Sequence, residues 1–318
     1  SGEILATRKA FGATLDKFAE QTPLLVGGSA DLEPSNYTTN FANNYGDFAK
    51  NRREGRNLAY GVREFPMAAA MNGMSLHGGV IPFGGTFLVF ADYERPALRL
   101  GSIQQCGVIH EFTHDSFWVG EDGPTHQPVE HAMALRSIPN FYVFRPADAK
   151  ETAASFKIAL QQTNTPCALL LTRQGIPILS LEEKTVYNGV SKGAYIIKDD
   201  DSPELIFLAT GSEVSLALEV SKLMNDKRVR VVSMPCWELF DAQSKEYRDS
   251  IIPSRGAMRI SFEAGITLGW ERYIGPNGLS IGLDRFGASA PGKDLAEEFG
   301  FTPQKISEKI ISHLKKLL

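Results

Sequence analysis

The chain has 318 residues, of which 43 % are hydrophobic and 22 % charged, which is an ordinary globular composition and argues against a disordered, collagen-like or coiled-coil protein. Its 33 Lys and Arg against 37 Asp and Glu give a net charge of −4, so charge gives no reason to expect binding to nucleic acid or to an anionic membrane. No run approaches the roughly 20 apolar residues that span a bilayer, and the first residues lack a signal-peptide pattern. We therefore expect a cytoplasmic, enzyme-like chain of two domains.

The first half repeats one pattern: a short apolar run, a cluster of Gly and polar residues, and then a segment with helical spacing. This pattern predicts strand–helix units, and hence a parallel sheet covered on both faces. Ligands of such sheets bind beyond the carboxyl ends of the strands, where the polar clusters lie. The expected strands are 24–26, 106–109, 141–144 and 168–171.

Two helices of this half have recognisable starts. Pro128 is expected as the first residue of a helix that continues to Leu135. Asp148 is expected to cap the helix 149–161. We place the domain boundary near residue 185, which gives domains 1–185 and 186–318.

A second strand–helix series follows, with strands expected at 204–209, 229–234 and 258–263. Ser212 is interpreted as the cap of helix 213–224, because the preceding Thr-Gly lacks the full pattern of a phosphate loop. The last helix begins after Thr302, and its apolar face is expected in the core. That face consists of Ile306, Ile310, Leu314 and Leu317. The predicted fold class is α/β, with two three-layer α/β/α domains that each have a mostly parallel sheet.

Three cysteines are widely spaced and lie in apolar or proline-containing surroundings. Neither a disulfide framework nor a zinc site is indicated, and we predict buried free thiols. The residues are Cys106, Cys167 and Cys236.

The segment 113–127 is the richest in possible chemistry, with two histidines and three carboxylates between a strand and a helix. Histidine titrates near neutrality and serves as acid, base or hydrogen-bond donor, which singles out His114 and His126. From composition alone a binding loop and a structural loop are equally plausible, and the position at a strand end favours binding.

Two other segments have an ordinary structural interpretation beside the functional one. Glu64 precedes a helix of small residues, where the helix dipole favours a carboxylate. Phe87, Phe90 and Tyr93 recur every three residues, which is more often typical of a core than of a ring-stacking platform.

Taken together, these motifs resemble the transketolase family of thiamine diphosphate enzymes over essentially the whole chain. The first half is similar to the family's pyrimidine-binding domain and the second to its C-terminal domain. The motifs are Ala6 to Lys9, Gly27 to Leu32 with Pro34-Ser35-Asn36, Gly61 to Glu64, Gly84 to Phe87, Thr113 to Ser116, Gly120 to Pro128, Ala209 to Glu213 and Asp284 to Ser289.

The resemblance implies a cofactor site. Glu64 matches the glutamate that hydrogen-bonds N1′ of the aminopyrimidine and so promotes deprotonation of the thiazolium carbon C2. Phe87, Phe90 and Tyr93 match the aromatic residues around the pyrimidine ring. Asp31 lies in a motif near the cofactor.

The resemblance also implies a sugar-phosphate site. His126, a second catalytic candidate, and Asp122 match residues that contact the reacting end of the sugar. The phosphate is expected to bind a cluster of two guanidinium groups, an imidazole and a hydroxyl, which suits a dianion. These residues are Arg8, Ser35, His114 and Arg173.

The chain departs from the family pattern in three ways. Phe65-Pro66 follows Glu64 where the family commonly has His, and Trp118 stands where a small residue is usual, so both are expected to reshape the pocket mouth. No Gly-Asp-Gly segment with a downstream Asn occurs. We therefore expect no metal site in this chain, and expect the Mg²⁺ and diphosphate ligands on a diphosphate-binding domain that the chain lacks.

The expected function is that of the C-terminal portion of a transketolase, which moves a two-carbon ketol unit between sugar phosphates in the pentose phosphate pathway. The expected state is a homodimer that is inactive without a diphosphate-binding domain or subunit. Alternatives are the natural second subunit of a split transketolase, a relative such as deoxyxylulose-phosphate synthase or the β-chain of a 2-oxo acid dehydrogenase, and a purely dimerising or regulatory module.

Overall fold

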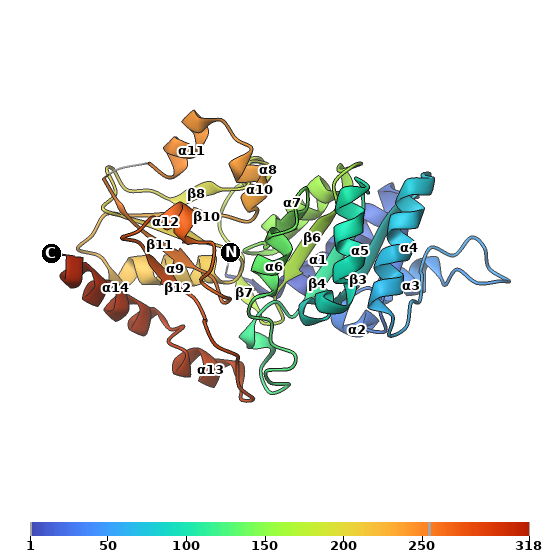
Figure 1. The fold of residues 1–318 in the computed structure, drawn as a ribbon, viewed down its shortest axis with the longest axis horizontal. Coiled ribbons are helices and arrows are strands. Elements are labelled where there is room, and N and C mark those ends of the chain that lie inside the picture. Colours follow the sequence, from blue (N-terminus) through green and yellow to red (C-terminus); the bar gives the residue numbers. More distant parts are fainter. Residues whose placement is uncertain (1, 254–255, 318) are drawn as a thin grey trace.

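The computed structural model describes residues 2–253 and 256–317 and contains two α/β units that lie side by side (Figure 1). The first sheet has five strands in the order β2-β3-β4-β6-β5, and all neighbouring strands are parallel. Their bounds are β2 Leu25–Ser29, β3 Ile81–Phe87, β4 Ile109–Thr113, β5 Tyr142–Phe144 and β6 Cys167–Leu171. The parallel order brings the carboxyl ends of the strands to one edge of the sheet.

Helices cover both faces of this sheet, because the side chains of its strands alternate between two apolar layers. Leu169 and Leu171 of β6 pack with α1 and α7, whereas Ala168 and Leu170 pack toward α5. The helices are α1 Thr7–Gln21, α2 Glu33–Asn36, α3 Thr39–Tyr45, α4 Glu64–His77, α5 Ala91–Ile103, α6 His131–Arg136, α7 Ala149–Leu160 and α8 Glu183–Ser191, with short 3₁₀ turns η1 Leu88–Phe90 and η2 Phe117–Val119. A small antiparallel pair joins β1 Ile4–Leu5 to β7 Ile176–Pro177.

The second sheet has the order β12-β11-β9-β10-β8, and only β8 runs antiparallel to its neighbour within the described residues. Its central strand again alternates, since Phe207 faces α9 and α14 while Leu208 faces the cluster around Trp237 and Trp270. The elements are β8 Tyr195–Lys198, β9 Leu205–Ala209, α9 Glu213–Leu223, β10 Val229–Ser233, α10 Trp237–Asp241, α11 Lys245–Ile251, β11 Met258–Phe262, α12 Glu271–Ile274, β12 Leu279–Ile281, α13 Gly292–Glu298 and α14 Pro303–Leu317. The predicted fold class is confirmed.

One predicted helix start is wrong, and two are confirmed, at Ala149 and at Glu213. Asp148 caps α7 as expected, with Oδ1 accepting from Glu151 N at 2.9 Å. However, α6 begins at His131 rather than at Pro128, because Val129 O accepts from Ile266 N of the second unit at 3.0 Å. Ser212 does not cap α9 with its side chain, since its hydroxyl donates to Glu213 at 2.8 Å.

The cysteines, the strand before His114 and the last helix were also predicted from the sequence. The three cysteines are free and buried, as predicted. The strand expected at 106–109 lies further along as β4, which makes Thr113 its last residue. In α14, Ile306 and Ile310 are buried but Leu317 is exposed at the end of the helix. None of the described helices is long and apolar enough to cross a membrane.

Buried charged side chains join the two units. Arg145, at the end of β5, donates through Nε to Asp115 at 2.9 Å and through Nη1 to Thr210 O at 2.8 Å. Arg136 donates through both terminal nitrogens to Glu263, at 2.8 Å each. These contacts link the first unit to the strand ends of the second.

Candidate functional site

Glu64 lies at the edge of a pocket of about 470 Å³ beside the carboxyl ends of the first sheet. Glu64 is the first residue of α4 and is partly buried, and it has no hydrogen bond or ion pair with the described residues. Asp31 shares the pocket and has a φ of 65°, a conformation that non-glycine residues seldom adopt and that is enriched at functional sites. The pocket is lined by Ala30, Asp31, Leu32, Val62, Glu64, Phe90 and Tyr93.

The aromatic residues form a continuous row from the sheet to this pocket. Phe87 and Phe90 are stacked, with ring centroids 5.8 Å apart and planes 4° apart, and Phe90 lies 6.0 Å from Tyr93. Phe87 is buried, whereas Tyr93 is 64 % exposed. The row is therefore part core and part open surface, and its three-residue spacing follows from the η1 turn that leads into α5.

His114 connects the aromatic row to the cationic cluster. Its ring lies 3.7 Å from that of Phe87, and Thr113 Oγ1 lies 2.8 Å from its Nδ1. Its φ of 61° is again in the left-handed region, which turns the side chain back over the strand end. The predicted cofactor and sugar-phosphate residues are thus neighbours.

The cationic cluster keeps His114 neutral. Burial lowers the pKa of His114 to about 3, and the positive charges of Arg8 and Arg173 act in the same direction. Arg8 donates through Nη1 to Ser35 O at 3.1 Å, which fixes the guanidinium beside the loop that carries the Ser35 hydroxyl. Two permanent cations and a neutral imidazole form a site for an anion.

The remaining predicted residues lie on the loop 120–127. His126 approaches the edge of Phe90, with ring centroids 5.8 Å apart, and its Nδ1 lies 2.9 Å from Thr125 Oγ1. Asp122 is exposed and makes no hydrogen bond or ion pair within the described part of the chain. The structure therefore brings His126, but not Asp122, into contact with the aromatic row.

Phe65 and Trp118, which depart from the family pattern, do not line the pocket beside Glu64. Trp118 stacks on Phe117, with centroids 5.2 Å apart, and lies against Gly292 of the second unit. Phe65 points outward from the first turn of α4 and is 45 % exposed.

Sequence reasoning gave no role to Asn36 and Glu111, which lie beneath the cluster. Asn36 is buried, accepts from Ser29 Oγ at 3.1 Å, and donates to Thr86 O at 3.1 Å and to Thr113 Oγ1 at 3.3 Å. Glu111 is fully buried, and burial raises its pKa well above the ordinary value. The one feature of the sequence that could have indicated Glu111 is a carboxylate within a predominantly apolar strand.

Two family models match successive parts of the chain. The model for the transketolase pyrimidine-binding domain matches residues 3–177, and the model for the transketolase-like C-terminal domain matches residues 193–302. The first match alone covers more than half of the chain.

Whole transketolases are similar to the chain over one part of their length. The transketolase of Geobacillus stearothermophilus is 48 % identical over 320 residues, covering 99 % of this chain and 48 % of that protein. The Aquifex aeolicus transketolase is 46 % identical over 312 residues, covering 97 % and 45 %. The chain thus spans about half the length of the curated relatives it matches.

Solved structures agree with these matches. Transketolase from Leishmania mexicana superposes with a TM-score of 0.94 at 44 % identity, covering 99 % of this chain and 46 % of that one. A protein described as a split-gene transketolase, inactive β4 tetramer, shares the fold over 98 % of this chain and 99 % of its own, with a TM-score of 0.76 at 24 % identity. From the family models and the extent of these identities, the chain belongs to the transketolase family.

Proposed function

We propose that the chain contributes the aminopyrimidine-binding and sugar-phosphate-binding parts of a transketolase active site. Such a site transfers a two-carbon ketol unit from a ketose phosphate to an aldose phosphate. The observation that carries the proposal is the contact between His114 and Phe87, because it joins the Glu64 pocket to the cluster around Arg8. Family membership supports transketolase over the other thiamine diphosphate enzymes considered from sequence.

The pocket fits the aminopyrimidine ring of thiamine diphosphate. Phe90 and Tyr93 offer ring faces, and Glu64 offers a carboxylate that has no partner among the described residues. When bound, the cofactor supplies a carbon nucleophile. In this proposal Glu64 would share a proton with the ring nitrogen N1′, Phe87 would support the position of Phe90 by stacking on it, and Asp31 would line the same pocket.

The cationic cluster fits the phosphate group of the sugar. Arg8 and Arg173 provide positive charge and bidentate hydrogen bonding to the phosphate. The neutral imidazole of His114 provides one N–H hydrogen-bond donor. The Ser35 hydroxyl adds a neutral donor. His126, at the edge of Phe90, and the exposed Asp122 are proposed to contact the reacting end of the sugar.

The diphosphate and Mg²⁺ ligands are proposed to come from a diphosphate-binding domain, since this chain has no Gly-Asp-Gly segment. That domain is either another segment of the same polypeptide or a separate subunit. A chain of this length and fold exists in the split-gene transketolase, whose β4 tetramer is described as inactive. We infer that the present chain is also inactive alone and pairs with a second copy in the working enzyme.

Complementation tests this function directly. The chain is mixed with the separately expressed diphosphate-binding domain of a close relative, and ketol transfer from xylulose 5-phosphate to ribose 5-phosphate is measured with thiamine diphosphate and Mg²⁺. Activity is expected only when both chains are present. If sedimentation shows that the two chains do not form a complex, the assay is repeated with the two segments joined in one engineered polypeptide. A fused, folded protein that binds the cofactor but transfers no ketol unit would refute the proposal.

A further inference from the structure

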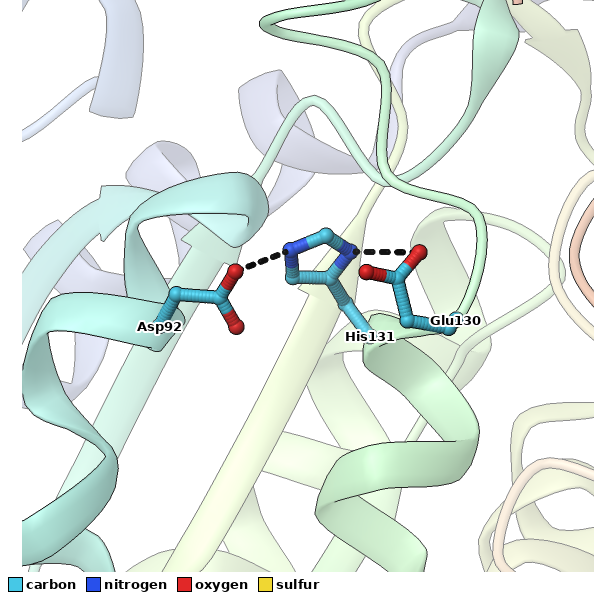
Figure 2. Close-up of side chains that lie close together, drawn as sticks. All are labelled: Asp92, Glu130 and His131. Carbon is cyan, nitrogen blue, oxygen red and sulfur yellow. Dashed lines mark hydrogen bonds and ion pairs between the residues drawn. The ribbon is translucent and has the colours of Figure 1, made fainter. Parts of the chain in front are cut away.

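Asp92, Glu130 and His131 converge outside the pocket, from helices that are far apart in the sequence (Figure 2). Asp92 lies in the first turn of α5, and His131 is the first residue of α6, directly after Glu130. His131 Nε2 lies 3.2 Å from Asp92 Oδ2, and His131 Nδ1 lies 3.9 Å from Glu130 Oε2. One ligand atom from each residue lies within 4.8 Å of the other two. An imidazole and two carboxylates therefore meet at one place.

The imidazole differs from its neighbours in burial. The side chain of His131 is 6 % exposed, whereas those of Asp92 and Glu130 are 67 % and 50 % exposed. His131 Nδ1 is shielded from solvent and has no hydrogen-bond partner in residues 2–253 and 256–317. Buried polar atoms are nearly always paired, so an unpaired ring nitrogen that faces a carboxylate calls for a ligand. The exposed carboxylates give an ion access to it.

The geometry suits a metal ion with few changes. Metal-binding histidines usually have a carboxylate at the opposite ring nitrogen, which fixes the tautomer, and here each ring nitrogen faces a carboxylate. Two ligand atoms about 2.0 Å from a tetrahedral zinc ion lie about 3.3 Å apart. The 3.9 Å between His131 Nδ1 and Glu130 Oε2 is close to this spacing, and the half-exposed Glu130 closes the difference by rotating its side chain, while Asp92 at Nε2 fixes the tautomer.

We propose that His131 Nδ1 and Glu130 bind a divalent ion of the zinc class, with Asp92 at Nε2 orienting the imidazole. The imidazole selects this class, because Mg²⁺ prefers oxygen ligands alone. The site is separate from the Mg²⁺ expected with the diphosphate, and it does not depend on the proposed function. The bound ion strengthens the link that runs from α6, which follows the loop of His126, through His131 to Asp92 in the first turn of α5.

Metal binding to the chain alone tests the proposal. The untagged, chelator-treated protein is titrated with Co²⁺, whose visible spectrum reports direct coordination by protein ligands, and Zn²⁺ is then added as competitor. We expect one Co²⁺ per chain, displaced by Zn²⁺. His131→Gln should abolish the spectrum, and Asp92→Asn should weaken Zn²⁺ binding by more than about 10-fold, since even indirect partners of a metal are worth that much. His77→Gln, an exposed histidine at the end of α4, is the matched control and should bind like the parent.

The outcomes separate a metal site from a charged bridge. If His131 is only an imidazolium between two carboxylates, no Co²⁺ spectrum appears and Zn²⁺ leaves the melting temperature unchanged, which overturns the proposal. Binding that is lost in His77→Gln and kept in His131→Gln overturns it as well. Circular dichroism checks that each variant folds, and if His131→Gln does not fold, Asp92→Asn decides.

Discussion

Arg145 and Glu213 form a buried ion pair between the two units, with Nη1 2.5 Å from Oε2. The second contact of Arg145 is Asp115, directly after His114, so the pair connects the cationic cluster to α9. Burial alone would lower the pKa of Arg145, but Glu213 and Asp115 hold it above its ordinary value. Gly211 is needed beside this pair, because its φ is 60° and a Cβ there would lie 2.6 Å from the guanidinium carbon.

Glu213→Gln should destabilise the protein strongly. The change leaves a buried guanidinium with one carboxylate instead of two, and breaking a buried pair typically costs about 3 kcal/mol or more. Urea unfolding followed by circular dichroism measures this loss. Asp249→Asn is the control, since it breaks the exposed pair with Lys245 and should leave the unfolding midpoint unchanged. Equal midpoints for the two variants would contradict the structural role of Arg145.

Glu151 should make stability fall as pH rises. Burial, followed by the neighbouring Asp148, raises the pKa of Glu151 from 4.5 to about 7, while its oxygens accept from Ala147 N, Tyr195 and Ser233 across the two units. The folded state therefore binds this proton more tightly than the unfolded state. Its contribution is complete below about pH 4.5 and is lost as the pH rises through about 7.

The measurement compares the parent with Glu151→Gln. The amide cannot titrate but donates where the carboxylate accepted, so the variant starts less stable. The gap in unfolding free energy should shrink between pH 5 and pH 8, by up to about 3 kcal/mol. Parallel stability curves over that range would show that Glu151 does not change protonation on unfolding.

The sequence was sufficient to predict what depends on local pattern. Apolar runs located four of the five strands of the first sheet but missed β3, whose residues had been interpreted by the spacing of their aromatic side chains. The parallel order of the strands placed Asp31, His114 and Arg173 at one edge of the sheet. The start of α6 was mispredicted because it depends on Val129 O, which is taken by Ile266 N from the other unit. No local signal reports such a contact.

The sequence also did not predict that the Glu64 pocket and the cationic cluster are neighbours. This adjacency depends on the positive φ of His114, which lets the ring reach Phe87. A histidine in the sequence does not by itself indicate a left-handed backbone conformation. Asn36 lies in the motif Pro34-Ser35-Asn36, but its hydrogen-bond partners Thr86 and Thr113 belong to strands far away in the sequence. Long-range pairing of this kind is decided by packing.

His114 should stay neutral over the whole physiological range. Since burial, Arg8 and Arg173 lower its pKa to about 3, its imidazole resonances should not shift between pH 8 and pH 5 in NMR titration. Assignment is made with His114→Asn. Arg8→Met removes one of the positive charges and should raise the pKa, although burial keeps it below the ordinary 6.5. A parent resonance that titrates above pH 6 would contradict the described cluster.

Glu64→Gln and Glu64→Ala should abolish most activity of the complemented enzyme without unfolding the chain. Glu64 is partly exposed and has no partner among the described residues, so its loss removes proton transfer rather than packing. Positioned acid–base groups are worth about 10²- to 10⁴-fold, and a fall of that size is expected in kcat. Glu20→Gln, an exposed glutamate on α1, is the control and should leave kcat unchanged.

The aromatic residues and the outcome for Glu64 complete the test of the pocket. Tyr93→Phe keeps the ring face and should keep activity, whereas Phe90→Ala should raise the KM for thiamine diphosphate. If Glu64→Gln retains the parent's kcat, Glu64 is not the proton-sharing group, and the pocket beside it binds the cofactor in another way or not at all.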